Sequence, residues 1–215
     1  MRIDHLVWYT ADLADGERQF TRWMDAAPAY GGVHPGEGTR NALVSLADDA
    51  YIEILARDPA QSETAVDPEV RGLDRAGLYH FAMSGEDLRV LKSRGEGAGL
   101  SGSGIVTGGR TLPDGRWLGW SLFGLRDHGF GALVPFFIDW TGSEHPAKGA
   151  PRGGRLISAE ARTPDVRGLR AVYAALGIAI PVVHAARPSL AVTIENSKGR
   201  CVLETVEPLR RGYVI

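Results

Sequence analysis

Two histidines lie at equivalent places in two similar segments of the 215-residue chain. The first segment runs from His5 to Leu13 and the second from His80 to Leu88, and in each an Asp-Leu pair follows the histidine at the same spacing. Both histidines lie in short apolar runs that are typical of β-strands. Because an imidazole can bind a metal ion or transfer a proton near neutral pH, the pair predicts a functional site.

Two carboxylates lie at matching positions of later strand-like runs. Glu53 lies within Tyr-Ile-Glu-Ile and Asp139 within Phe-Ile-Asp-Trp. A buried carboxylate needs a cation, a metal ion or strong hydrogen bonds. Imidazoles and carboxylates together suit Zn, Ni, Fe, Co or Mn. We therefore predict that His5, Glu53, His80 and Asp139 converge on one metal or substrate site. The alternatives are hydrogen-bonded core histidines and an ion pair of Asp139 with an arginine.

The elements that must position these residues repeat along the chain. Each segment reads as a strand, a polar helix cap, an amphipathic helix and further strands, in the order β-α-β-β-β. Candidate caps are Thr10 or Asp12, Ser84 and Thr163. A fainter third copy begins at Ser158, where serine replaces the histidine. Repetition at this period predicts three copies of one supersecondary unit.

These repeats predict an α+β fold built from βαβββ modules. Paired modules at 1–60 and 76–142 make up residues 1–150, and a third, diverged βαβββ unit makes up residues 151–215. Polar, proline-containing connections at 57–75 and 141–155 fit this division. The paired modules should hold the site, and the third unit should pack alongside them.

Charge and cysteine content narrow the function classes. The formal net charge of −2 gives no basic surface for nucleic acid or an anionic membrane. Cys201 is the only cysteine, so neither an internal disulfide nor a cysteine-rich zinc site can form. The N-terminal residues do not read as a signal peptide, and no apolar run is long enough to span a bilayer. We expect a cytoplasmic protein with a small-molecule partner, and a homodimer is compatible with the sequence.

Five further residues are candidates for substrate binding. His34 lies in a Gly/Pro-rich turn that could border a cavity mouth, and Thr39 and Asn41 lie in the strand that follows. Arg110 and Trp120 could bind an anionic or planar ligand. The alternatives are a solvated turn histidine, an exposed strand face and a hairpin with one exposed arginine.

The βαβββ repeat, the strand histidine near the N-terminus and the closing strand Tyr51–Ile54 resemble the vicinal oxygen chelate superfamily, which includes glyoxalase I. Three stretches resemble its glyoxalase-like domain branch in particular: Gly31–Leu43, Pro135–Trp140 and His145-Pro146. The resemblance covers nearly the whole chain and is weakest in the third unit. It implies that the βαβββ modules form a strongly curved, cup-shaped mixed sheet.

The resemblance implies a divalent metal ion bound at the positions of His5, Glu53, His80 and the acid Asp139. Two positions depart from the family pattern. The fourth ligand is usually glutamate, whereas Asp139 is one methylene shorter. Glutathione-dependent glyoxalases have an arginine four residues after the first histidine, whereas Tyr9 stands there in this chain. A glutathione adduct is therefore not the expected substrate.

With such a metal, a substrate with adjacent oxygens could chelate at the open coordination positions while Glu53, the candidate base, moves a proton. We predict a metal-dependent lyase, isomerase or epimerase that acts on a small oxygenated molecule. One alternative is a metal-free protein that binds or sequesters a small molecule, as antibiotic-resistance members of the superfamily do. The other is an extradiol-type dioxygenase.

Overall fold

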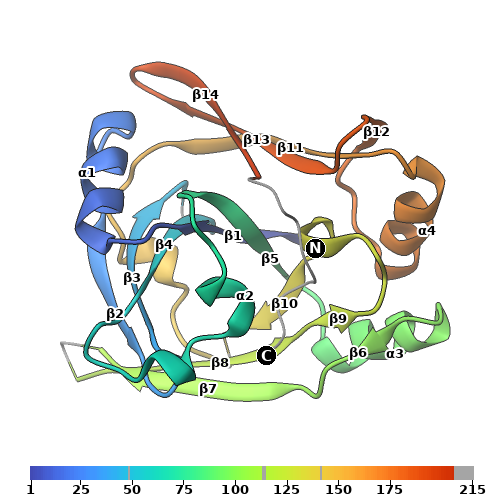
Figure 1. Cartoon of the computed structure of the whole chain (residues 1–215), viewed down its shortest axis with the longest axis horizontal. Helices are drawn as coiled ribbons and strands as arrows, with labels where there is room; N and C mark the ends of the chain where they lie inside the picture. The colour runs from blue at the N-terminus through green and yellow to red at the C-terminus, as the bar shows by residue number, and fades with distance from the viewer. Residues whose placement is uncertain (48, 113–114, 141, 206–215) are drawn as a thin grey trace.

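The computed structural model describes residues 1–47, 49–112, 115–140 and 142–205, and Figure 1 shows how the elements are arranged. The first module contains β1 (Arg2–Tyr9), α1 (Leu13–Trp23), β2 (Ala29–His34), β3 (Thr39–Ser45) and β4 (Tyr51–Arg57). The connection to the second module holds a 3₁₀ turn (Glu63–Ala65) and the short helix α2 (Pro68–Arg71).

The second module begins with β5 (Gly77–Ser84) and α3 (Leu88–Gly97). Its remaining strands are β6 (Ser101–Gly102), β7 (Val106–Thr111), β8 (Trp117–Phe123), β9 (Leu125–Arg126) and β10 (Phe136–Asp139). Short 3₁₀ turns flank β10 at Gly131–Leu133 and Pro146–Lys148. The two-residue strands β6 and β9 pair only with each other.

The eight other strands of the two modules form one curved sheet in the order β2-β3-β4-β1-β5-β10-β8-β7. Each module contributes a parallel pair, β1 with β4 and β5 with β10, and the antiparallel pair β1–β5 joins the modules at the centre. Because the sheet curves until it is nearly closed, its edge strands β2 and β7 approach each other (Figure 1). Its concave face therefore encloses space.

The alternation of side chains along β1 divides the interior into two parts. Leu6 and Trp8 face the large apolar core that also contains Phe20 of α1. Val7 and Tyr9, on the other face, belong to a separate cluster inside the curved sheet. Since successive strand residues point to opposite faces, the position of a polar residue in its strand decides whether it reaches the enclosed space.

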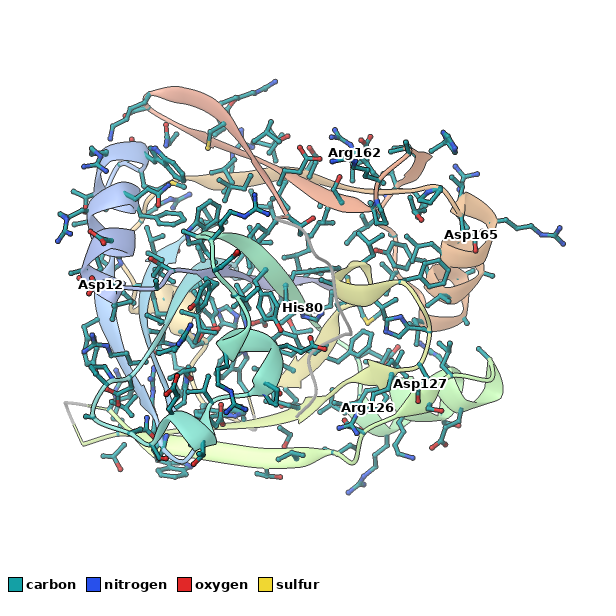
Figure 2. All side chains as sticks on the ribbon, in the orientation of Figure 1. Asp12, His80, Arg126, Asp127, Arg162 and Asp165 are labelled. Carbon is teal, nitrogen blue, oxygen red and sulfur yellow. The ribbon has the colours of Figure 1, made fainter. Side chains whose placement is uncertain are left out.

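Three aspartates at repeated positions cap the three longest helices. Asp12 accepts a hydrogen bond from the backbone N–H of Asp15, and Asp87 accepts two at the start of α3. Asp165 accepts one from the backbone N–H of Gly168 at the start of α4 (Val166–Leu176), and Figure 2 shows Asp12 and Asp165 at these ends. The caps expected at Ser84 and Thr163 are therefore wrong: Asp87 and Asp165, three and two residues further on, cap these helices.

The third unit has the predicted βαβββ order. Its elements are β11 (Arg155–Thr163), α4 (Val166–Leu176), β12 (Val182–His184), β13 (Ser189–Asn196) and β14 (Gly199–Glu204). They form a four-stranded sheet, β12-β11-β13-β14, along the top of Figure 1. Residues 206–215 of the predicted unit lie outside the described residues.

The third unit shares a core with the curved sheet. Leu169, Tyr173 and Leu176 of α4 belong to the same buried apolar cluster as Phe81 and Phe137 of the sheet. The prediction of an α+β fold with a curved mixed sheet of βαβββ modules is confirmed. Among the described residues, no helix combines the length and apolar character needed to cross a membrane.

A hydrogen bond between α4 and the second module provides a test of this packing. The buried Tyr173 hydroxyl donates to the backbone carbonyl of Leu133 at 2.6 Å. Tyr173→Phe leaves that carbonyl unsatisfied, and we expect a loss of about 1–2 kcal/mol of unfolding free energy, measured by urea denaturation. Tyr30→Phe is the matched control, because Tyr30 is 55% exposed. Equal stability of the two variants would contradict this packing.

Candidate functional site

The space inside the curved sheet holds a cavity of about 80 Å³. Its wall combines charged and polar side chains with aromatic rings from both modules. The polar members are His5, His34, Glu37, Asn41, Glu53 and Arg110, and the aromatic members are Tyr51, Trp120, Phe136 and Trp140. An apolar wall with a few convergent polar groups is the usual lining of a small-molecule site.

A β-bulge places Asp4 and His5 beside each other. In the pairing of β1 with β5, Ile3 faces Met83 and His5 faces Ala82, so Asp4 is the extra residue. Neighbouring residues of a regular strand point to opposite faces, whereas a bulge redirects one of them. Here Oδ1 of Asp4 lies 2.8 Å from Nδ1 of His5.

Three side chains hold the fully buried Asp4 carboxylate. Besides His5, Nε1 of Trp140 donates to Oδ2 at 3.2 Å, and Nε2 of His145 lies 3.1 Å from the same oxygen. Burial by itself would raise the pKa of Asp4, but the hydrogen bonds from His145 and His5 and the charges of these imidazoles outweigh it. The pKa therefore lies well below its ordinary value, and Asp4 is ionised.

The ionised Asp4 fixes the tautomer of His5. A carboxylate can only accept hydrogen bonds, so Nδ1 of His5 carries the proton that it donates to Asp4. The opposite nitrogen, Nε2, lies 3.8 Å from Oε2 of Glu53. Tyr51 stacks on the imidazole with ring centroids 4.7 Å apart. His5 thus presents one oriented nitrogen to the cavity, as a general acid or base requires.

Glu53 lies at the centre of a network of polar side chains. Nδ2 of Asn41 donates to Oε1 of Glu53 at 2.6 Å, and Nε2 of His34 lies 3.4 Å from the same oxygen. Nη1 of Arg110 donates to Oδ1 of Asn41 at 3.4 Å. The hydroxyl of Thr39, which does not border the cavity, lies 2.8 Å from Nδ1 of His34 and orients that ring. Glu53 is therefore held in place from two sides.

Two glycines of β2 make room for this network. A side chain at Gly31 would collide with the Asn41 amide, and one at Gly32 would collide with the Arg110 guanidinium. Gly32 also has φ of +136°, a conformation that other residues rarely adopt. Burial lowers the pKa of Arg110, and the negative charge of Glu53 opposes this shift. Arg110 stays protonated, because an arginine side chain is not deprotonated in a protein. The cavity thus keeps one cation near Glu53.

His80 lies outside the cavity wall, in the interior of the molecule (Figure 2). It is 1% exposed, and the ring of Phe136 stacks on it at 5.4 Å. The same Phe136 ring packs edge-on against His5, also at 5.4 Å. Burial, together with the nearby His128 and His5, lowers the pKa of His80 to about 3, so the imidazole is neutral. The Phe136 ring therefore contacts both imidazoles.

Asp139 lies on the opposite face of β10. Phe136 and Ile138 border the cavity, whereas Phe137 belongs to the core on the other side and Asp139 is exposed. The repeat alignment pairs Asp139 with Glu53, but Ile138 is the residue that shares the concave face. A shift of one residue in a strand reverses the face on which a side chain lies.

The structure does not bring the four predicted ligands together. His5 and Glu53 border the cavity, His80 lies behind Phe136, and Asp139 points away. Within the described ranges, no group of three or more His, Cys, Asp or Glu side chains is arranged to hold a metal ion. The predicted donor set therefore does not fit one divalent ion, and we assign no chemical step to a metal.

Of the five predicted substrate-binding residues, four border the cavity: His34, Asn41, Arg110 and Trp120. The residues that sequence reasoning missed are Asp4, Glu37, Tyr51, Trp140 and His145. The adjacent pair Asp4-His5 is visible in the sequence, but regular strand geometry separates the two side chains. Only the bulge joins them, and nothing in the sequence predicts its position.

The tautomer of His5 can be tested directly. In the neutral form of His5, ¹⁵N NMR should show the proton on Nδ1 in the wild type. Asp4→Asn should move it to Nε2, because an amide can donate to Nδ1 whereas a carboxylate cannot. Asp12→Asn, which changes only a helix cap, should leave the tautomer unchanged. A proton on Nε2 in the wild type would contradict the assigned geometry.

Burial of neutral His80 predicts a stability loss in acid. Its pKa of about 3 lies below the ordinary value of 6.5, so below pH 6.5 the unfolded chain binds a proton that the folded chain does not. Between pH 7.5 and 5.0 this should cost about 2 kcal/mol of unfolding free energy, and more as the pH falls towards 3. Denaturation of wild type and His80→Gln at both pH values measures it. Equal pH dependence of the two proteins would contradict the burial of a neutral imidazole.

Comparison with known proteins places the chain in a family. The family model of the glyoxalase-like domain matches residues 3–177. No curated protein matches the sequence.

Solved structures share the fold at low identity. A hypothetical protein from Staphylococcus aureus has a TM-score of 0.66 at 15% identity and covers 96% of this chain and 86% of its own. A mutant 4-hydroxymandelate synthase from Streptomyces coelicolor has a TM-score of 0.51 at 15% identity, covering 94% of this chain and 62% of its own. Because the family model spans most of the sequence, the chain belongs to the glyoxalase-like domain family.

Proposed function

We propose that the chain is an enzyme of the isomerase, epimerase or lyase type that moves a proton on a small oxygenated carboxylate. The observation that carries the proposal is the pairing of an oriented imidazole with a carboxylate on one cavity wall. Nε2 of His5 lies 3.8 Å from Oε2 of Glu53, and Asp4 fixes the opposite side of the imidazole. Two such groups within reach of one small molecule are what proton transfer requires.

Arg110 gives this site its preference for an anion. It borders the cavity and its guanidinium donates to Asn41 at 3.4 Å. A guanidinium matches a carboxylate in shape and charge, so Arg110 can hold the substrate carboxylate next to Glu53 and His5. The cavity volume of about 80 Å³ suits a head group of a few non-hydrogen atoms.

In the proposed reaction, Glu53 removes a proton from the carbon beside the substrate carbonyl. The electron pair of that C–H bond passes to the carbonyl oxygen. For this step His5 is an imidazolium: Nδ1–H stays on Asp4, and a second proton, taken up from solvent, lets Nε2–H donate a hydrogen bond to the enolate oxygen. Return of a proton to the opposite face of that carbon completes an epimerisation. When the carbon also carries a hydroxyl group, transfer of the hydroxyl proton to the enolate oxygen and return of the first proton to the former carbonyl carbon complete an isomerisation. Asn41 holds Oε1 of Glu53 through a 2.6 Å hydrogen bond and leaves Oε2 for the substrate.

A second candidate function is metal-free binding of the same small anion without turnover. One observation favours it: His5 and Glu53 lie within ion-pair distance, at 3.8 Å, and His34 approaches the same carboxylate at 3.4 Å. Charged groups that satisfy one another need no reaction to explain their burial. Turnover separates the two functions.

Solvent exchange tests the catalytic proposal. In D₂O, the protein should catalyse deuterium incorporation at the carbon next to the carbonyl or carboxylate in a panel of small 2-oxo and 2-hydroxy acids, followed by ¹H NMR. Glu53→Gln and His5→Ala should each lower the exchange rate by about 10²–10⁴-fold, the usual effect of removing a general acid or base.

Two exposed residues of the third unit provide matched controls for these variants. Glu204→Gln and His184→Ala change the same residue types on β14 and β12 and should leave the exchange rate unchanged. Binding of an acid without exchange would favour the second candidate function. Exchange that requires an added divalent metal and disappears in His80→Ala would contradict the assignment of the chemistry to His5 and Glu53 alone.

A further inference from the structure

The curved sheet has a seam where its edge strands β2 and β7 face each other. These strands stand at the two ends of the strand order, and both lie at the lower left of Figure 1. Arg110 of β7 crosses the seam: its guanidinium lies against Gly32 of β2 and donates to Asn41 of β3. No strand pairing joins β2 to β7 in the described part of the chain. The Arg110 side chain, rather than strand pairing, therefore connects the two edges of the sheet.

A groove of about 650 Å³ follows this seam on the outside. It shares Leu43, Arg110, Leu118 and Pro146 with the inner cavity, which holds only about 80 Å³. A ligand much larger than such a small head group would extend beyond the inner cavity. Its remaining part would pass Arg110 and enter the groove.

The groove presents two exposed aromatic side chains. Trp117 is 64% exposed and Tyr30 is 55% exposed, and both line the groove. The Trp117 ring lies over Gly109 of the paired strand β7, where a side chain would collide with it. A large ring held against backbone keeps one face free at little entropic cost, as stacking on a planar ligand requires.

We propose that the groove binds the planar, apolar tail of the substrate, whose carboxylate head lies beside Arg110 in the inner cavity. The substrate class is then an aryl-substituted 2-oxo acid or a related aromatic carboxylate. This inference rests on the proposed function for the position of the head. The tail site is an independent addition, because it depends on Trp117 and Tyr30, which line the groove and not the inner cavity that His5 and Glu53 border.

Pyruvate and phenylpyruvate test the groove, since they share a head and differ by one phenyl ring. Isothermal titration calorimetry should show that phenylpyruvate binds about tenfold more tightly than pyruvate. Trp117→Ala should weaken phenylpyruvate by about three- to tenfold and leave pyruvate unchanged. Trp117→Phe should keep most of the preference. Val202→Ala, an exposed apolar residue of β14 at 59% exposure, is the matched control and should change neither affinity.

The outcomes separate this inference from the proposed function. Equal affinity for the two acids, or a preference that Trp117→Ala does not reduce, overturns the tail site and leaves the proton-transfer proposal standing. A Trp117-dependent preference without any deuterium exchange supports the tail site and overturns the catalytic proposal. Failure of both acids to bind overturns the tail site together with the assigned head position. Arg110→Gln should weaken both acids alike, because it acts on the shared head.

Discussion

The buried carboxylate of Asp4 is the constraint on which the site depends. Such a group stays ionised inside a protein only if hydrogen bonds replace its hydration. His5, Trp140 and His145 supply them, from β1, from the residue after β10 and from the following connection. These three segments must therefore be in place before the His5 imidazole has a fixed orientation. The connection after β10, which reads as a linker in the sequence, is part of the site.

One extra residue in β1 makes this arrangement possible. Without the bulge at Asp4, the residues Asp4 and His5 would point to opposite faces of the sheet, and the carboxylate could not orient the imidazole. The two-residue period of a strand also explains where Asp139 lies. Its neighbour Ile138 shares the face that Glu53 occupies, so Asp139 lies on the opposite face. In a curved sheet, chemistry thus depends on single-residue differences in register that leave the fold unchanged.

This dependence explains how far the sequence could predict the structure. The repeat predicted the βαβββ modules, because apolar periodicity and helix caps recur in each copy, and it singled out Glu53. Asn41 and Arg110 were predicted separately as binding residues, and all three lie in regular strands. The sequence could not predict that Phe136 lies against both His5 and His80, since contacts between these three rings depend on how side chains of different strands pack. Equivalent positions in two modules need not receive equivalent surroundings.

The two modules have in fact become unequal inside the sheet. The first contributes most of the polar groups of the cavity, including His5, Asn41 and Glu53. The second contributes apolar and aromatic side chains, and Arg110 is its only charged residue among the cavity-lining residues that the structure describes. Such a wall, polar on one side and apolar on the other, matches a molecule with an anionic head and an apolar body. An asymmetric ligand of this kind is better matched by two unequal halves than by two equal ones.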